Sequence, residues 1–112
     1  EVVLAGNLDW PAWANALDNL EPEDTVPTRA LTGRLGRGVA TNFVTAAASP
    51  DAPRPAPYPV QRGLTAAMKA TGAAANDPHR MQLWAGQSAA MAKPIAAGAL
   101  VREIWDEARR LL

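Results

Sequence analysis

The chain has 112 residues, and its 11 Lys and Arg residues balance its 11 Asp and Glu residues, so we predict no partner among nucleic acids or anionic membrane surfaces. It has no cysteine and one histidine, His79, which excludes disulfides, thiolate catalysis and a zinc site, so no metal site is predicted. No run approaches the roughly twenty apolar residues that cross a bilayer, and no signal-peptide pattern is present, so we expect a cytoplasmic protein.

The N-terminal residues predict the end of a strand followed by a helix. Residues 1–8 open with a short β-branched run, which favours the end of a strand or its trailing loop. Asp9 is a candidate N-cap for a helix over 10–20. Trp13 and Leu17 stand four positions apart, so they share one apolar face of that helix.

An extended segment and a glycine-rich loop are predicted next. Residues 25–31 are expected to form an edge segment, because a proline within it cannot donate to a sheet ladder. The loop at 32–38 contains three glycines together with Arg34 and Arg37. Residues 39–44 are then predicted to form a short helix.

This loop has two interpretations. Exposed backbone N–H groups beside arginines can bind a phosphate, although the loop lacks the Gly-Lys-Ser/Thr ending of a Walker motif. Alternatively, the glycines form a turn in which Arg34 and Arg37 pair with the acidic residues at 21–24. In either case Asn42 is a candidate hydrogen-bonding anchor for the loop.

Prolines interrupt the middle of the chain. Five of them lie within 49–59, which forbids regular helix and predicts a polyproline-like segment. That segment is either a linker or an arm packed on a partner surface, and Tyr58 favours the arm. Residues 60–75 predict a helix with a weak point at Gly72, and residues 78–92 predict another.

The clearest helical period covers residues 96–112. Its apolar positions follow a 3.6-residue repeat: Leu100, Val101, Ile104, Trp105, Ala108, Leu111 and Leu112. Asp106 is spaced to pair with Arg102 and with Arg110 on the opposite face. We therefore assign 94–112 as a C-terminal amphipathic unit that packs on something larger.

Small residues surround a tryptophan and an amide within 83–91, which we place in an apolar helix. They allow close approach of a neighbouring helix or of a flat ligand, with Gln87 as the polar group. The alternative is tight helix packing without a ligand. No catalytic residue is assigned, because His79 is predicted to be a surface residue in a turn and no serine lies in a nucleophile elbow.

Several of these elements, in this order and spacing, resemble the C-terminal third of bacterial nitronate monooxygenases. They are Thr25 to Arg34, Arg37, Asn42-Phe43, Tyr58-Pro59-Val60-Gln61, Leu64-Thr65 and Leu83-Trp84-Ala85-Gly86-Gln87-Ser88. FMN-type enoyl-ACP reductases are close relatives with a similar Ala-Gly-Gln-Ser element. The stretch 38–41 is less basic than is usual in the family, and 1–20 matches poorly.

The resemblance implies a mainly α fold of short helices with an extended Pro-rich segment. This would be the C-terminal part of an FMN-binding (β/α)₈ TIM barrel that carries a helical substrate-side domain, assigned here to 9–93. Family members oxidise alkyl nitronates with O₂ through FMN. Their phosphate-binding glycine loops and catalytic histidine precede the region matched here, and His79 does not match that histidine.

The same resemblance suggests site residues and partners. Residues expected beside the flavin are Trp84, Gly86, Gln87 and Ser88, and residues expected on a substrate-side loop are Arg34, Arg37, Asn42 and Tyr58. The partners are the barrel portion of the same protein, the nitronate and O₂; an oligomer is left open. We expect the isolated chain to be inactive. Alternatives are an enoyl-ACP reductase-like segment and a helical protein-interaction module without catalysis.

Overall fold

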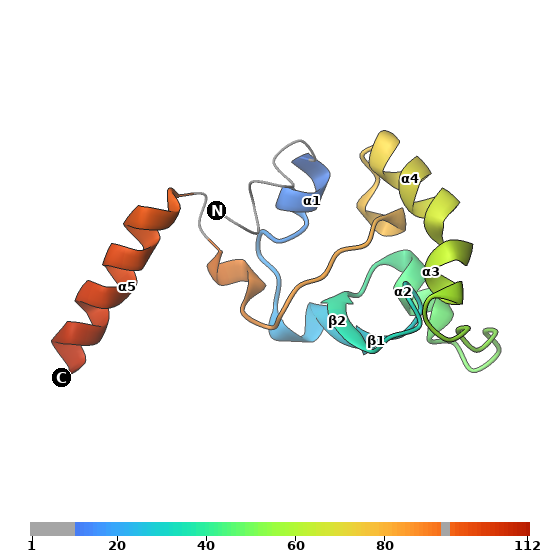
Figure 1. Ribbon diagram of the computed structural model, residues 1–112, viewed down its shortest axis with the longest axis horizontal. Helices are drawn as coiled ribbons and strands as arrows, with labels where there is room; N and C mark the ends of the chain where they lie inside the picture. The colour runs from blue at the N-terminus through green and yellow to red at the C-terminus, as the bar shows by residue number, and fades with distance from the viewer. Residues whose placement is uncertain (1–10, 93–94) are drawn as a thin grey trace.

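The computed structural model describes residues 11–92 and 95–112, and the predictions for 1–8, Asp9 and Trp10 lie outside these ranges (Figure 1). The described part is mainly helical with a small two-stranded sheet. In chain order, with η for a 3-10 helix, its elements are α1 (Pro11–Asn15), η1 (Pro22–Asp24), β1 (Thr25–Thr28), β2 (Gly36–Val39), α2 (Asn42–Ala47), α3 (Val60–Leu64), α4 (Ala66–Ala74), η2 (Pro78–Arg80), η3 (Ala89–Met91) and α5 (Ala97–Leu111).

Helix α1 is shorter than the predicted helix over 10–20. It ends at Asn15 and turns follow, and Asn19 has a positive φ of 60°, which a right-handed helix does not permit. The apolar face is nevertheless confirmed, because Trp13 and Leu17 are both buried. They form the main core cluster with two residues from far along the chain, Met81 and Leu83.

Strands β1 and β2 form an antiparallel pair in which Thr25 lies opposite Val39 and Thr28 opposite Gly36. The predicted edge segment at 25–31 is therefore a strand in its first four residues. The predicted helix over 39–44 is wrong at its start, because Val39 ends β2 and α2 begins at Asn42. Thr41 caps α2 with a side-chain oxygen that accepts a hydrogen bond from the Val44 backbone N–H.

A third extended segment lies beside β2, where the sequence predicted a helix over 78–92. At the start of this range only the three residues Pro78–Arg80 are helical, as η2. Trp84 then forms a β-bridge with Gly38. The Val39 backbone N–H donates to the Leu83 carbonyl at 2.9 Å. The helix prediction is wrong because backbone pairing with β2, far away in the sequence, outweighs local helical preference.

The helix predicted over 60–75 is divided at Thr65 instead of at Gly72. The Thr65 hydroxyl is buried and donates to the Leu31 carbonyl at 2.8 Å, which anchors the junction of α3 and α4 to the turn after β1. Gly72 lies within α4 and is buried against Arg80, where an added Cβ would come within 2.9 Å of the Arg80 backbone. That glycine is therefore a packing contact between α4 and η2.

The proline-rich segment packs on its own chain, as an arm does, although the surface it meets is not a separate partner. Residues 53–57 have no helix or strand. Gly33 has a φ of +87° and approaches so closely that a Cβ there would lie 2.5 Å from the Ala56 carbonyl oxygen. Gln61 fixes the arm, since it accepts from the Ala56 N–H at 3.0 Å and donates to the Ala30 carbonyl at 2.6 Å.

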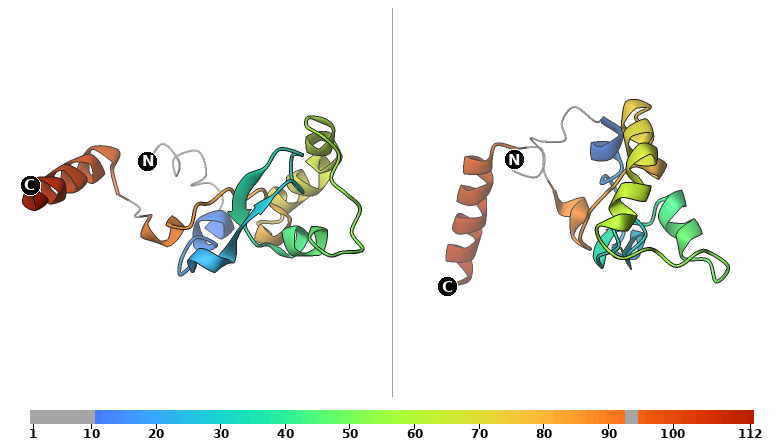
Figure 2. Two further views of the ribbon diagram at one scale, coloured as in Figure 1. Left: turned by 90° about the horizontal axis from the view of Figure 1, so that it is seen from below. Right: turned by 45° about the vertical axis from the view of Figure 1, so that its right-hand side comes forward.

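Helix α5 confirms the predicted C-terminal helix almost residue for residue. It stands apart from the rest in all three views (Figures 1 and 2), and none of its residues is buried. Arg110 bonds the backbone carbonyl of Asp106, not the carboxylate that the sequence suggested. No helix among the described residues is long and apolar enough to cross a membrane.

Candidate functional site

One solvent-open hollow of about 620 Å³ brings together residues that the sequence placed in two separate groups. Its lining residues are Thr32, Arg34, Leu35, Gly36, Arg37, Tyr58, Arg62, Lys69, Gln82 and Trp84. Arg34, Arg37 and Tyr58 were assigned to a substrate-side loop, whereas Trp84 was assigned to the flavin. The hollow is therefore the strongest candidate for a functional site in the described part of the chain.

The indole of Trp84 lies on a backbone surface made by two glycines of β2. A Cβ built on Gly36 would come within 2.8 Å of the ring, and one on Gly38 would come within 3.2 Å of the ring and 2.6 Å of the Leu83 carbonyl oxygen. Because real Cβ atoms do not approach other atoms within 3.0 Å, a larger residue would displace the indole at Gly36 and the Leu83 carbonyl at Gly38. The glycine spacing thus positions Trp84 at the wall of the hollow.

Both arginines of the glycine-rich loop are held by neighbours that are not acids. The Arg34 guanidinium lies over the Tyr58 ring, 4.0 Å from its centroid, as a cation–π contact. Arg37 donates through Nη1 to the Thr25 carbonyl at 2.6 Å. The alternative in which these arginines pair with the acidic segment 21–24 is therefore wrong.

Sequence reasoning missed three lining residues from later in the chain. Lys69 on α4 donates from Nζ to the Gln82 side-chain oxygen at 3.1 Å. Partial burial lowers the pKa of Lys69, and the nearby positive charge of Arg62 lowers it further. Arg62 and Lys69 are seven residues apart, two helical turns, and that spacing was the available signal.

Four of the predicted site residues lie elsewhere. Asn42 is the exposed first residue of α2. Gly86, Gln87 and Ser88 follow the extended segment and are all exposed. A Cβ built on Gly86 would meet no atom within 4 Å, so the backbone there is open to close approach.

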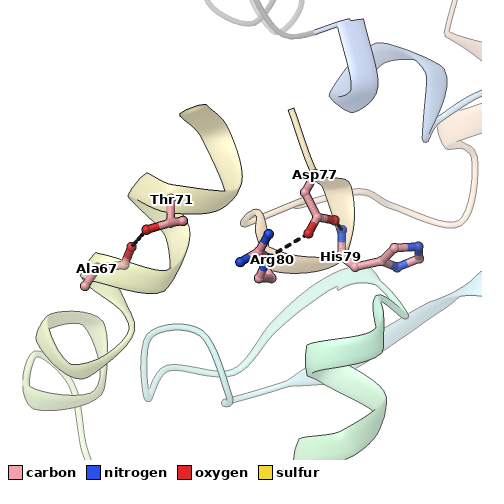
Figure 3. A network of polar contacts seen from close by, with 5 residues as sticks. All are labelled: Ala67, Thr71, Asp77, His79 and Arg80. Atoms are coloured by element: carbon pink, nitrogen blue, oxygen red, sulfur yellow. Dashed lines mark hydrogen bonds and ion pairs between the residues drawn. The ribbon is translucent and has the colours of Figure 1, made fainter. Parts of the chain in front are cut away.

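The single histidine takes part in a structural turn, as predicted. Asp77 caps η2 by accepting from the His79 backbone N–H at 2.9 Å, and it accepts from Arg80 Nε at 2.7 Å (Figure 3). The imidazole is exposed and extends away from the carboxylate (Figure 3). The Arg80 hydrogen bond is the main cause that lowers the pKa of Asp77. No cluster of His, Asp or Glu suited to a metal ion occurs among the described residues.

Comparison with known proteins gives consistent matches. The family model described as nitronate monooxygenase matches residues 11–107. A nitronate monooxygenase of Paraburkholderia phytofirmans is 38% identical over 90 residues, which cover 77% of this chain and 24% of that protein. A probable nitronate monooxygenase of Staphylococcus aureus strain MSSA476 is 29% identical over 98 residues, covering 88% of this chain and 27% of that protein.

A solved structure agrees with these sequence matches. The nitroalkane oxidase from Streptomyces ansochromogenes superimposes with a TM-score of 0.71 at 36% sequence identity. The superposition covers 83% of this chain and 26% of that structure. The chain therefore spans about a quarter of the length of each of these three relatives.

Proposed function

Because the family model covers residues 11–107, this chain belongs to the nitronate monooxygenase family, and we propose that it forms the C-terminal segment of an FMN-dependent enzyme that oxidises alkyl nitronates with O₂. The observation that carries this proposal is the convergence of Arg34, Arg37, Tyr58 and Trp84 on one hollow. The redox chemistry belongs to the flavin. The residues of this chain bind and orient the flavin and the nitronate, and they exclude water from the site.

The segment 84–88 is suited to the ring of FMN. Trp84 offers a flat, half-buried side chain, and Gln87 and Ser88 are exposed hydrogen-bonding groups three and four residues after the bridge that Trp84 makes to β2. Open space around Gly86 permits a planar group to approach the backbone. We assign Trp84, Gly86, Gln87 and Ser88 to the flavin side on these grounds.

The substrate side is assigned to Arg34, Arg37, Tyr58 and Asn42. A nitronate is an anion, and the hollow presents guanidinium groups on the wall that Trp84 also lines. The Arg34–Tyr58 stack restrains one of these guanidinium groups before any ligand arrives. Asn42 lies outside the hollow lining, so its role in this proposal is to support the loop from the start of α2.

The remaining partner in this proposal is the barrel portion of the same protein. Helix α5 carries Val101, Ile104 and Trp105 with exposed fractions of 65, 57 and 62%. An apolar helix face that is exposed to this degree is typical of a protein interface. Since the chain spans about a quarter of its relatives, the barrel segments present in a longer relative would cover that face.

A matched pair of glycine substitutions tests the proposal in the natural protein that contains this chain. Gly86 and Gly63 are both exposed, and an added Cβ meets no atom within 4 Å at either position. If FMN lies against Gly86, then Gly86→Ala should weaken flavin binding about tenfold or more, equivalent to roughly 1.4 kcal/mol. Gly63→Ala should retain flavin, because Gly63 lies in α3 and outside the segment 84–88 that is assigned to the flavin.

The readouts are flavin content after purification and O₂ consumption with propyl-2-nitronate. The unsubstituted protein and Gly63→Ala should be yellow and should consume O₂ with this substrate. Equal flavin content and equal turnover in both variants would contradict the assignment of Gly86. A colourless unsubstituted protein that does not respond to FMN would contradict the proposed activity as a whole.

A further inference from the structure

We propose that the same hollow is a binding site for the phosphate group of a small phosphate monoester. Its lining includes four cationic side chains, Arg34, Arg37, Arg62 and Lys69, and no Asp or Glu among the residues that the structure describes. The chain as a whole has no net charge, so this is a local concentration of positive charge. A nitronate, with one negative charge, would leave most of that charge unbalanced.

The positive charges of Arg62 and Lys69 repel each other in the hollow. Partial burial lowers the pKa of Lys69 most, and the like charge of Arg62 lowers it further by disfavouring protonation of the lysine. A dianion placed between them would reverse this effect by attracting both. The arrangement therefore favours a multiply charged ligand over an empty hollow.

The donors that remain suit phosphate oxygens. Lys69 has three N–H donors, and Gln82 accepts one of them. Arg34 has its guanidinium carbon over the Tyr58 ring, and its N–H groups that do not meet the ring can donate to a ligand. Arg37 is restrained by Thr25, yet it still contributes its charge to the hollow.

The uncharged walls indicate the rest of the ligand. Trp84 presents an indole on which a planar group can stack, and Leu35, which also lines the hollow, is 62% exposed. A phosphate monoester with a planar or apolar body would contact both kinds of wall. Two sources share this chemistry: the phosphate of FMN itself and a separate phosphorylated metabolite.

Binding of inorganic phosphate to the natural protein tests this inference without measuring the proposed oxidation. Titration by calorimetry at low ionic strength would use the flavin-loaded protein and the flavin-free protein side by side. Lys69→Met and Arg62→Gln should each weaken phosphate binding about ten- to hundredfold, the range for a charged hydrogen bond. The control is Arg54→Gln, which removes an exposed arginine that does not line the hollow.

Comparison of the flavin-loaded with the flavin-free protein distinguishes a separate phosphorylated metabolite from the phosphate of FMN. Phosphate binding to the flavin-loaded protein would support a separate phosphorylated metabolite. Binding only to the flavin-free protein, with weaker FMN affinity in Lys69→Met, would support the phosphate of FMN. No binding to either form, as expected if a carboxylate from elsewhere in the protein fills the hollow, would overturn the inference, as would an equal loss in Arg54→Gln.

A second measurement needs no substitution, so it remains informative if a variant fails to fold. Phosphate should protect Lys69 of the unsubstituted protein from an amine-reactive acylating reagent, as followed by peptide mass spectrometry. Chloride at the same ionic strength should protect Lys69 less than phosphate does. Equal labelling of Lys69 in the two salts would overturn the inference. These results are independent of O₂ consumption, so the proposed oxidation and the phosphate site can fail separately.

Discussion

The part of the chain from 11 to 92 and helix α5 contain similar kinds of apolar residues but use them differently. In the first region, Trp13, Leu17, Met81 and Leu83 bury one another within a single core cluster. In α5 no residue is buried, although its apolar stripe is the most regular in the sequence. Regular periodicity thus predicts a helix well but does not reveal whether the helix has a partner within the chain.

This difference affects how the two regions are stabilised. An α-helix of 15 residues is about 22 Å long, and helices of this length are marginal in water without tertiary packing. The region from 11 to 92 instead has contacts between residues distant in sequence, such as the bridge between Gly38 and Trp84. We therefore expect substitutions in the two regions to have unequal effects on stability.

The largest effect should come from a pair of aliphatic truncations. Leu83→Ala removes a side chain that is 1% exposed, and it should reduce the free energy of unfolding by about 2–5 kcal/mol. Ile104→Ala, at 57% exposed, should change it by less than about 0.5 kcal/mol in this chain. Denaturant unfolding followed by tryptophan fluorescence measures both. Equal losses would mean that α5 already packs on the rest of the chain.

A matched pair of glycines sharpens the comparison. Gly38→Ala would place a Cβ 2.6 Å from the Leu83 carbonyl oxygen, so we expect a loss of about 1–3 kcal/mol in unfolding free energy. Gly98→Ala in α5 meets only Arg102 at an ordinary 3.6 Å, and it should raise helicity with a gain of roughly 0.5 kcal/mol. Thermal melting and far-UV circular dichroism test the opposite signs. A stabilised Gly38→Ala variant would contradict the close approach of the Leu83 segment.

The smallest effect should be a change in acid sensitivity at η2. The pKa of Asp77 is lowered below 3.8 in the folded chain, chiefly by the Arg80 hydrogen bond, so the unfolded chain binds its proton first. The resulting stability is present above pH 3.8 and is lost as the pH falls through the folded-state pKa. Asp77→Asn should therefore make the melting temperature depend less on pH at and below pH 3.8. Asp51→Asn, in the proline-rich segment, is the control and should leave that curve unchanged.

How well the sequence predicted the fold depends on how local the deciding interactions are. Helix α5 was predicted because its period lies within one stretch of sequence. The proposed helix over 78–92 failed because the deciding hydrogen bonds connect Leu83 and Ala85 to β2, more than forty positions earlier. The two-stranded sheet itself was not foreseen, although the extended segment that supplies β1 was.

The candidate site shows the same limit. Arg34 and Tyr58 were both assigned to a substrate-side loop without being paired, and the structure places them in direct contact. Arg62 and Lys69 were missed, because only the packing of α3 and α4 beside the loop brings them to the hollow. Their spacing of two helical turns indicated a shared face, but nothing local indicated what that face would meet.

The glycines at 36 and 38 also affect how this wall of the hollow could evolve. The indole of Trp84 lies against main chain, so its position does not depend on the rotamer of any facing side chain. We expect that exposed lining residues such as Leu35 can vary without moving the indole. Among related proteins, we therefore expect ligand preference to change through the exposed lining residues while Trp84 keeps its position. Where the position of this indole differs, we expect a larger residue in place of one of the two glycines.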